Sequence, residues 1–271
     1  MYSREIYARG VCMKCWMKRL AEHYESLKRC YPAERLIVVF DIDDTILDLR
    51  HMILHVLSAF DARYETGYFR KLSVQDIGVS EFEVHLMMAK FGIPTRVQRE
   101  VLEWFAKHSW STPVIREGHR PFPGAMDVIR WLQLREKTFV GLNTGRPETM
   151  RPDTLQSLNR LGRPHGVVFH DHLLFMNPYG WAERIEESKV EGIAYFQSRG
   201  FRIAAFVDNE PANLQAVAAY DRTGEILLLH ADTTFTTEKE LIPEKAVSGN
   251  VYDISALVRA AAGRQAWGEA A

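Results

Sequence analysis

The sequence predicts an α/β protein built on a parallel sheet, with a helical insertion after the first strand. Short apolar runs rich in β-branched residues alternate with segments whose apolar residues recur at helical spacing. Strands that alternate with helices are joined by right-handed crossovers, so the sheet they form is parallel. The 271 residues suffice for one large domain or for a core with an inserted domain. Residues 49–110 carry no strand signal and form the predicted insertion.

The amino-acid composition and net charge indicate which kinds of binding partner to expect. Apolar residues make up 46% and charged residues 25%, and 34 basic residues against 35 acidic ones leave a net charge of −1. This balance favours neither nucleic acid nor an anionic membrane as partner. No apolar run approaches the roughly 20 residues that span a bilayer, and the amino terminus lacks a signal-peptide pattern. The three cysteines are few and odd in number, so they do not indicate a disulfide framework. We therefore expect a cytoplasmic protein.

The amino-terminal segment predicts an amphipathic helix over residues 11–29. This helix carries Cys12 and Cys15, separated by two residues, with His23 and Cys30 further along. A zinc site or a redox pair is one interpretation. Cysteines packed in or beside the helix are the interpretation we prefer, because no second close pair completes a four-ligand set.

Residues 36–40 predict a fully buried strand that ends in a group of acids, Asp41-Ile42-Asp43-Asp44-Thr45. Acids at the end of a buried strand are costly unless a cation or hydrogen bonds receive their charge. Ligands bind at the carboxyl ends of strands in open α/β sheets. In an extended chain Asp41 and Asp43 point to the same side, where two carboxylates suit a hard cation such as magnesium. The alternative is a solvated turn that caps the next helix.

Within the insertion we predict three helices, at residues 49–64, 81–90 and 95–108. Thr95 and Gln98 have the spacing of a capping box after Pro94. Prolines at 113, 121 and 123 indicate the return to the main domain. The polar residues near the two ends of the insertion are candidates for substrate contact, although each is expected to be solvated: His51, His55, Arg116, His119 and Arg120.

The rest of the chain resumes the alternation of helices and strands. The predicted helices are 126–134, 147–161, 181–199 and 211–220, and the predicted strands are 138–142, 166–169, 201–207 and 225–229. Glycines at 162 and 200 follow two of these helices, as is common at helix carboxyl ends. The Ala-rich segment 260–271 is expected to be a frayed helix or a tail.

Two of these strands also end in residues that suit an anion or a cation. Asn143-Thr144-Gly145-Arg146-Pro147 follows the strand 138–142, and its hydroxyl and backbone N–H groups can hold an anion. The alternative is an ordinary helix cap by Thr144. Asp208 follows the strand 201–207 and precedes Asn209-Glu210-Pro211-Ala212-Asn213.

Asp41-Ile42-Asp43-Asp44-Thr45 resembles the first motif of the haloacid dehalogenase superfamily, Asp-x-Asp-x-Thr after an apolar strand. The resemblance covers about residues 36–230, with Thr144 at the second motif, Lys189 at the third and Asp208 at the fourth. It implies a Rossmann-like three-layer sandwich with a parallel central sheet. The core would comprise residues 1–49 and 119–259, the α-helical cap residues 50–118, and the tail residues 260–271.

The resemblance also implies a magnesium-dependent phosphatase. Asp41 would attack the phosphorus to form an aspartyl-phosphate, and Asp43 would protonate the leaving oxygen and then activate water. Magnesium would be held by Asp41, the backbone carbonyl of Asp43, and Asp208. Thr144, the N–H of Gly145, and Lys189 would hold the phosphate oxygens, with Arg184 as the alternative to Lys189.

This chain departs from the family pattern beside Asp208, where the family usually adds a second acid. Asn209, Ala212 and Asn213 occupy the positions in question. Asn209 can bind magnesium through its carbonyl oxygen, and Asn213 or Glu210 can reach the metal through water.

The resemblance leaves three functions open. Asp43 favours a phosphatase over carbon–halogen chemistry, because the dehalogenases of the family lack this acid. A phosphomutase or phosphotransferase would use the same site, and a non-catalytic binding protein could keep the same fold. A cap over the site and the near-zero net charge predict a small-molecule phosphate ester as substrate, and neither nucleic acid nor membrane as partner.

Overall fold

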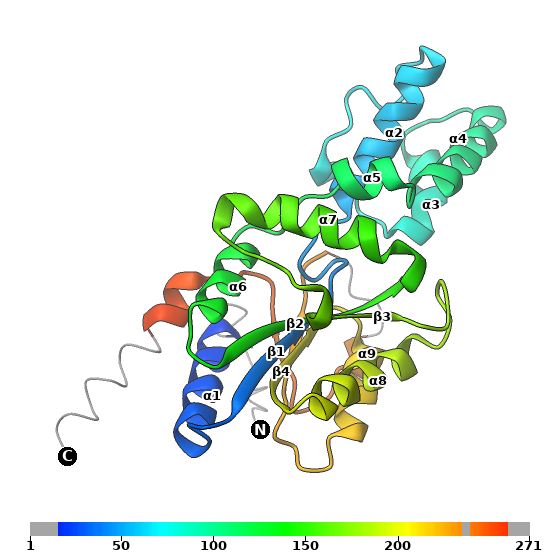
Figure 1. The fold of residues 1–271 in the computed structure, drawn as a ribbon. Helices are drawn as coiled ribbons and strands as arrows, with labels where there is room; N and C mark the ends of the chain where they lie inside the picture. The colour runs from blue at the N-terminus through cyan, green and yellow to red at the C-terminus, as the bar shows by residue number, and fades with distance from the viewer. Residues whose placement is uncertain (1–15, 235–238, 260–271) are drawn as a thin grey trace, which may run out of the picture.

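The computed structural model describes residues 16–234 and 239–259. Over these residues the chain forms a parallel sheet covered by helices on both faces, with a group of helices beyond the end of the sheet (Figure 1). This arrangement confirms the predicted α/β fold with a parallel central sheet.

The sheet has β1 at its interior, and its strand order is β3-β2-β1-β4-β5-β6. The strands are β1 Arg35–Phe40, β2 Thr138–Pro147, β3 Leu174–Asn177, β4 Phe201–Asp208, β5 Leu227–Ala231 and β6 Val247–Gly249. The register sets Phe40 beside Leu142 of β2 and Val207 of β4. The residues that follow these three positions therefore meet at one edge of the sheet.

Helices cover both faces of the sheet because β1 is apolar on both sides. Leu36, Val38 and Phe40 pack with α1 (Trp16–Cys30), α6 (Ala125–Gln133) and α7 (Arg151–Gly162). Ile37 and Val39 pack with α8 (Ile185–Ser198) and α9 (Pro211–Tyr220). All five side chains are fully buried. Successive residues of a strand face opposite sides, so an uninterrupted apolar run fits this central position.

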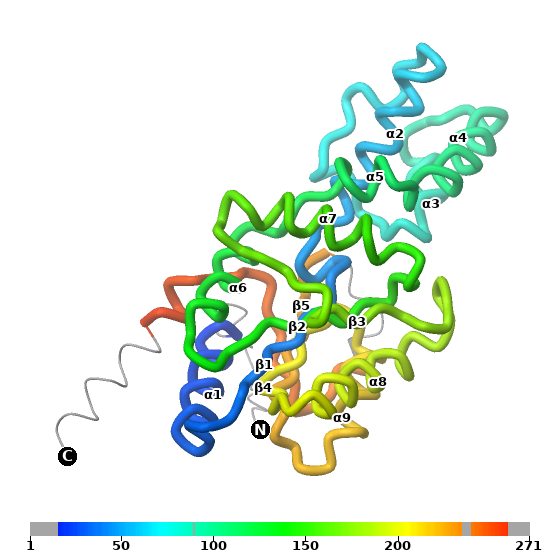
Figure 2. The backbone as a smooth tube through the Cα atoms, viewed as in Figure 1, coloured from blue at the N-terminus to red at the C-terminus, as the bar shows by residue number. Residues whose placement is uncertain are grey.

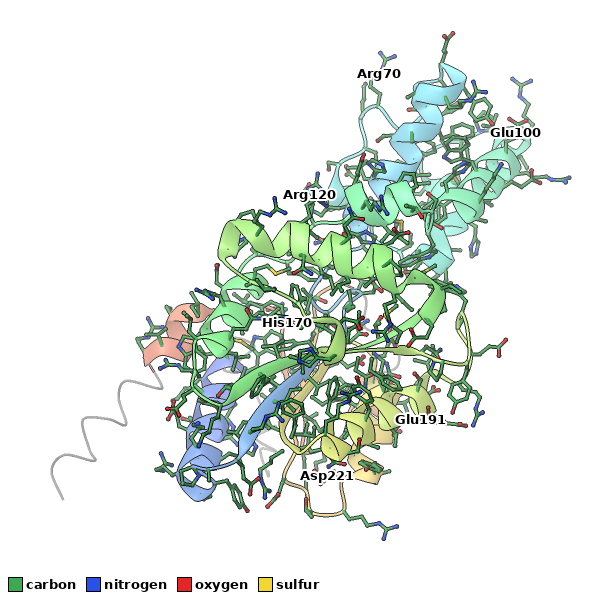
Figure 3. The ribbon with its side chains drawn as sticks, in the orientation of Figure 1. Arg70, Glu100, Arg120, His170, Glu191 and Asp221 are labelled. Carbon is green, nitrogen blue, oxygen red and sulfur yellow. The ribbon has the colours of Figure 1, made fainter. Side chains whose placement is uncertain are left out.

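The helical insert has an apolar core of its own. It comprises α2 Arg50–Tyr64, α3 Val84–Lys90, α4 Thr95–His108 and α5 Thr112–Glu117. Phe60, Met88 and Val101 are among its buried residues. The insert lies beyond α7 (Figure 2). Arg70 and Glu100 lie toward its outer end, and Arg120 lies near α7, where the chain returns to the core (Figure 3).

The predicted helix start at Pro147 was wrong. β2 continues to Pro147, which pairs with Asn177 of β3, and a 3₁₀ turn at Glu148–Met150 precedes α7. A proline can close a strand as readily as it opens a helix, because it lacks an N–H in either case. α7 instead begins at Arg151 and has Pro152 in its first turn.

The predicted strand 166–169 was also wrong. The Asn159 side chain accepts the N–H of Phe169 at 2.8 Å and donates to its carbonyl at 3.0 Å. These bonds replace the strand partner that Phe169 would otherwise require. The chain pairs with β2 only later, through Leu174–Asn177.

The remaining differences between the predicted and observed secondary structure are smaller. α8 begins at Ile185, four residues later than predicted, because Ala182 and Arg184 adopt positive φ values of 57° and 48°. Pro94 precedes α4, and the Gln98 side chain donates to the carbonyl of Ile93, so the predicted capping box is absent. β6 was not predicted, since it is three residues long.

The amino-terminal prediction lies partly outside the described residues. Cys12 and Cys15 precede residue 16, and residues 260–271 lie beyond the described range. α1 ends at Cys30, whose thiol is free and exposed. Among the described residues there is no helix with the length and apolar content needed to span a membrane.

The first prediction concerns the contact of α1 with the edge of the sheet. A Cβ added at Gly249 of β6 would overlap the ring of Trp16, which also donates to the carbonyl of Val251 at 2.7 Å. We expect Gly249→Ala to lower the free energy of unfolding by about 1–3 kcal/mol, because this overlap displaces a buried side chain.

Urea unfolding measures this change. Gly78→Ala is the matched control, since nothing lies within 4 Å of the added methyl group and φ is not positive there. A Gly249→Ala protein as stable as the control would contradict the packing of α1 against β6.

Candidate active site

The chain turns sharply after β1, and this turn presents two acids. The N–H groups of Ile46 and Leu47 both donate to the carbonyl of Ile42, at 2.8 Å and 2.9 Å. Asp44 takes a left-handed conformation, with φ of 50°, which aspartate tolerates better than most residues. The turn places Asp41 and Asp43 on one cavity before the chain enters the insert.

Lys189 of α8 lies between two buried carboxylates. Its Nζ is 2.5 Å from Asp41 Oδ1 and 3.0 Å from Asp208 Oδ2. The same ammonium donates to the carbonyl of Asn143 at 2.8 Å. Lys189 is 1% exposed and Asp208 is fully buried. Because an unpaired buried charge is costly, each of these three charges depends on the other two.

This cluster retains negative charge that a bound cation would neutralise. One ammonium is shared by two carboxylates. Burial, opposed by Lys189 and reinforced by Asp208 and Asp43, raises the pKa of Asp41 to about 7. A divalent cation would reverse this shift and favour the ionised carboxylate. Carboxylate and carbonyl oxygens are the ligands that magnesium prefers, so the donor set fits the predicted ion.

Protein side chains alone do not form a complete metal shell here. Over residues 16–234 and 239–259, no three His, Cys, Asp or Glu side chains converge on a metal-sized site. Asp41 and Asp208 would therefore be joined by a backbone carbonyl, predicted at Asp43, and by water. Magnesium commonly retains several waters when few carboxylates bind it.

The residues after Asp208 hold its carboxylate in place. Asp208 Oδ1 accepts the N–H of Glu210 at 2.8 Å and the side-chain amide of Asn213 at 3.1 Å. Asn209 Oδ1 accepts the hydroxyl of Thr45 at 3.2 Å. A carbonyl oxygen has two lone pairs, so Asn209 stays a candidate ligand. Asn213 donates to Asp208, which indicates an orienting role.

Asp43 is held by an arginine that the sequence did not connect with it. Arg146 donates from Nε to Asp43 Oδ2 at 2.7 Å and from Nη2 to Asp43 Oδ1 at 2.6 Å. Burial alone would raise the pKa of Asp43, but the charge and hydrogen bonds of Arg146 lower it overall. In this structure the Asp43 side chain is therefore an oriented carboxylate.

Of the two phosphate-binding residues predicted in β2, Thr144 is buried, whereas Gly145 lines the cavity. Thr144 is 1% exposed, and its hydroxyl accepts the N–H of Arg146 at 3.2 Å. Gly145 and Arg146 are the residues of this segment that line the cavity. The alternative to Lys189, Arg184, is half exposed and paired with Glu187.

A close contact between α8 and β2 fixes the position of Lys189. A Cβ added at Gly192 would overlap the side chain of Asn143. The Asn143 amide donates to the carbonyl of Lys189 at 2.8 Å, and Lys189 Nζ donates back to the carbonyl of Asn143. Glycine at 192 permits this approach, which the sequence analysis did not detect.

The acids open into a cavity of about 420 Å³ between the core and the insert. Its charged lining includes Asp41, Asp43 and Lys189, and its apolar lining comprises Leu49, Phe82, Trp110, Trp181, Ala182 and Ile185. Ligand sites commonly have this size and combine an apolar wall with a few convergent polar groups. The Trp110 and Trp181 rings, with centroids 4.7 Å apart, bring the insert and the β3–α8 loop together.

His119 was expected to be solvated, and this expectation was wrong. The side chain is fully buried, with Nδ1 3.0 Å from the carbonyl of Ile115 and Nε2 3.3 Å from Nη2 of Arg146. Nδ1 therefore carries the proton, and Nε2 accepts from the arginine. Burial, together with the charge of Arg146, lowers the pKa of His119 to about 4.

The other polar candidates have different surroundings. Arg116 pairs with Asp153 of α7 at 2.7 Å, and Arg120 donates to the backbone carbonyls of Glu117 and His119. His51 lies 3.9 Å from Asp48. None of these residues is among those lining the cavity.

Comparison with solved structures supports the fold assignment. The chain resembles a haloacid dehalogenase family hydrolase from Deinococcus radiodurans with bound phosphate and sodium, at 15% identity and a TM-score of 0.50, covering 86% of this chain and 96% of that one. It also resembles a protein assigned as a phosphatase from Clostridium difficile, at 14% identity and a TM-score of 0.52, covering 82% and 97%. A third, assigned as a β-phosphoglucomutase from Thermotoga maritima, matches at 14% identity and a TM-score of 0.50, covering 85% and 99%.

These likenesses show a shared fold. No protein-family model matches the sequence, and no curated protein matches it. The chain therefore has the fold of the haloacid dehalogenase-like hydrolases, as its first motif predicted.

The second prediction uses the buried His119. Its pKa is about 4 in the folded protein and about 6.5 in the unfolded chain, so the unfolded chain binds more protons between these values. The contribution of His119 to stability is complete above pH 6.5 and is lost as pH falls toward 4. We expect the wild type to lose about 2 kcal/mol more than His119→Gln between pH 7 and pH 5.

Urea unfolding of both proteins at the two pH values measures this difference. Glutamine can donate to Ile115 and accept from Arg146 without titrating. Equal losses in the two proteins would contradict a buried, neutral histidine.

Proposed function

We propose that the protein is a magnesium-dependent phosphatase that hydrolyses a small phosphomonoester through an aspartyl-phosphate at Asp41. One observation carries this proposal. Asp41, at the carboxyl end of a central strand, shares Lys189 with the buried Asp208 and lies on the same cavity as Asp43. The haloacid dehalogenase-like fold supports it.

The carboxylate of Asp41 is the proposed nucleophile. Its oxygen forms the bond to phosphorus while the bond from phosphorus to the leaving oxygen breaks. Magnesium, when bound by Asp41, Asp208 and the Asp43 carbonyl, with Asn209 as a further candidate, would neutralise phosphate charge and keep Asp41 ionised. Because Lys189 contacts Asp41 directly, its ammonium is near the oxygens that gain charge during transfer.

Asp43 is the proposed acid and base. The negative charge of a bound phosphate ester would raise the pKa of Asp43, so that it takes up a proton when substrate binds. It gives this proton to the leaving oxygen in the first step, and it takes a proton from the water that cleaves the aspartyl-phosphate in the second. Gly145 lines the same cavity, and its N–H is the group proposed to hold a phosphate oxygen. The hydroxyl oxygen of Thr144 accepts the N–H of Arg146 and keeps its own hydrogen to donate to a phosphate oxygen.

A small ester is the proposed substrate. The insert, about residues 50–118, would act as a cap, because Trp110 and Phe82 bring its side chains to the cavity that holds Asp41. A cap excludes water during transfer and limits the size of the substrate. The apolar wall suits a leaving group with an apolar surface, and the net charge of −1 does not favour nucleic acid. We place the enzyme in the cytoplasm.

The third prediction tests the nucleophile with a panel of small phosphomonoesters. Asp41→Asn keeps the shape of the side chain but removes the charge that attacks phosphorus. We expect release of inorganic phosphate to fall by about 1000-fold or more, as for the loss of other catalytic nucleophiles. Excess chelator should abolish wild-type turnover, and added magnesium should restore it.

Asp153→Asn is the matched control, because Asp153 pairs with Arg116 on the surface of α7 and does not line the cavity. Circular dichroism must show both variants folded. A folded Asp41→Asn protein with a tenth of wild-type activity, or full activity in chelator, would contradict the proposed function.

A further inference from the structure

Arg146 has almost no contact with solvent, and its polar contacts are with the protein. The residue is 1% exposed. Nε and Nη2 form two parallel bonds to Asp43, at 2.7 Å and 2.6 Å. Nη1 donates to the hydroxyl of Thr154 at 3.2 Å, and Nη2 also donates to Nε2 of His119 at 3.3 Å. Four of the five guanidinium N–H groups are thus directed at protein atoms.

The groups that hold Arg146 come from three parts of the chain. Thr154 belongs to α7, His119 belongs to the segment that returns from the insert, and Trp110 lies between α4 and α5. The Trp110 ring lies over the guanidinium, with its centroid 5.1 Å from Cζ. A planar guanidinium fixed on several sides can fix the plane of the carboxylate that it binds.

We propose that Arg146 is a positioning residue that orients the Asp43 carboxyl group toward the leaving oxygen of the substrate. The inference rests on the proposed function, in which Asp43 exchanges the proton. Both oxygens of Asp43 accept from Arg146, which fixes the plane of the carboxyl group. A second lone pair on one of these oxygens holds the proton that Asp43 gives to the leaving oxygen and later takes from water.

The two roles predict different kinetics. A residue that orients the acid matters most when the leaving group needs a proton, as with phenyl phosphate. It matters little for p-nitrophenyl phosphate, whose leaving group departs as a stable anion. A residue that binds phosphate would affect both esters equally and would weaken the binding of inorganic phosphate.

Arg146→Lys is the direct test, because lysine keeps the charge but lacks the planar pair of donors. We compare kcat/KM, because it reports the steps up to the first phosphoryl transfer and omits the hydrolysis of the aspartyl-phosphate that both esters share. We expect kcat/KM for phenyl phosphate to fall by about thirtyfold or more, within the range of general acid catalysis. For p-nitrophenyl phosphate we expect kcat/KM to stay within about threefold of the wild type. Asp43→Asn should show the same contrast between the esters, with a larger loss.

A second variant covers the case in which Arg146→Lys does not fold. Thr154→Val removes the partner of Nη1 and leaves the arginine in place. It should lower kcat/KM for phenyl phosphate by about threefold or more while leaving kcat/KM for p-nitrophenyl phosphate unchanged. Arg160→Lys is the matched control, since Arg160 is an exposed residue of the same helix.

Calorimetry with inorganic phosphate provides a readout that does not require turnover. We expect Arg146→Lys and the wild type to bind phosphate with dissociation constants within about threefold of each other. Equal loss of kcat/KM for both esters, or phosphate binding weakened by about tenfold, would overturn the positioning role. Retained activity in Asp41→Asn would instead refute the proposed function, so the two failures are distinguishable.

Discussion

The interaction on which the rest of the structure depends is the contact of Lys189 with Asp41 and Asp208. Two carboxylates and one ammonium are buried together at the carboxyl edge of the sheet. None of them could be buried alone at a tolerable cost. The cluster joins the ends of β1 and β4 to α8, and the bond from Lys189 to the Asn143 carbonyl adds β2. The parallel sheet brings these strand ends together, and the cluster supplies the charged groups of the proposed active site.

The two acids of the first motif have different cationic partners. Asp41 meets an ammonium through one oxygen, whereas Asp43 is held through both oxygens by a planar guanidinium. A nucleophile must approach phosphorus, while an acid needs a fixed direction toward the leaving oxygen. The contrast between Lys189 and Arg146 therefore fits the different roles proposed for residues two positions apart. Through His119 and Trp110, the second ion pair also connects the insert with the site.

The features that could be predicted from the sequence are those that a short run of neighbouring residues indicates. The apolar run before Asp41 predicted a buried strand, and acids or hydroxyls after successive strands predicted the edge where they meet. The bond between Arg146 and Asp43 joins residues 103 positions apart, and no local pattern indicates it. The contact of the buried His119 with Arg146 joins residues 27 positions apart, and no local pattern indicates it either. The edge strand β3 was placed too early, at residues 166–169, because Asn159 satisfies the backbone of Phe169 there, an exchange that an apolar run does not reveal.

The central claim is that Asp41 becomes phosphorylated during turnover, and trapping the intermediate tests it most directly. The protein would be mixed with a small phosphomonoester that it hydrolyses, quenched in acid within the first turnovers, and treated with borohydride. Borohydride reduces an aspartyl-phosphate to homoserine, which peptide mass spectrometry locates. The proposed mechanism predicts homoserine at position 41 when substrate is present and none when substrate is omitted. Modification of a different residue, or an unmodified Asp41 peptide during active turnover, would contradict it.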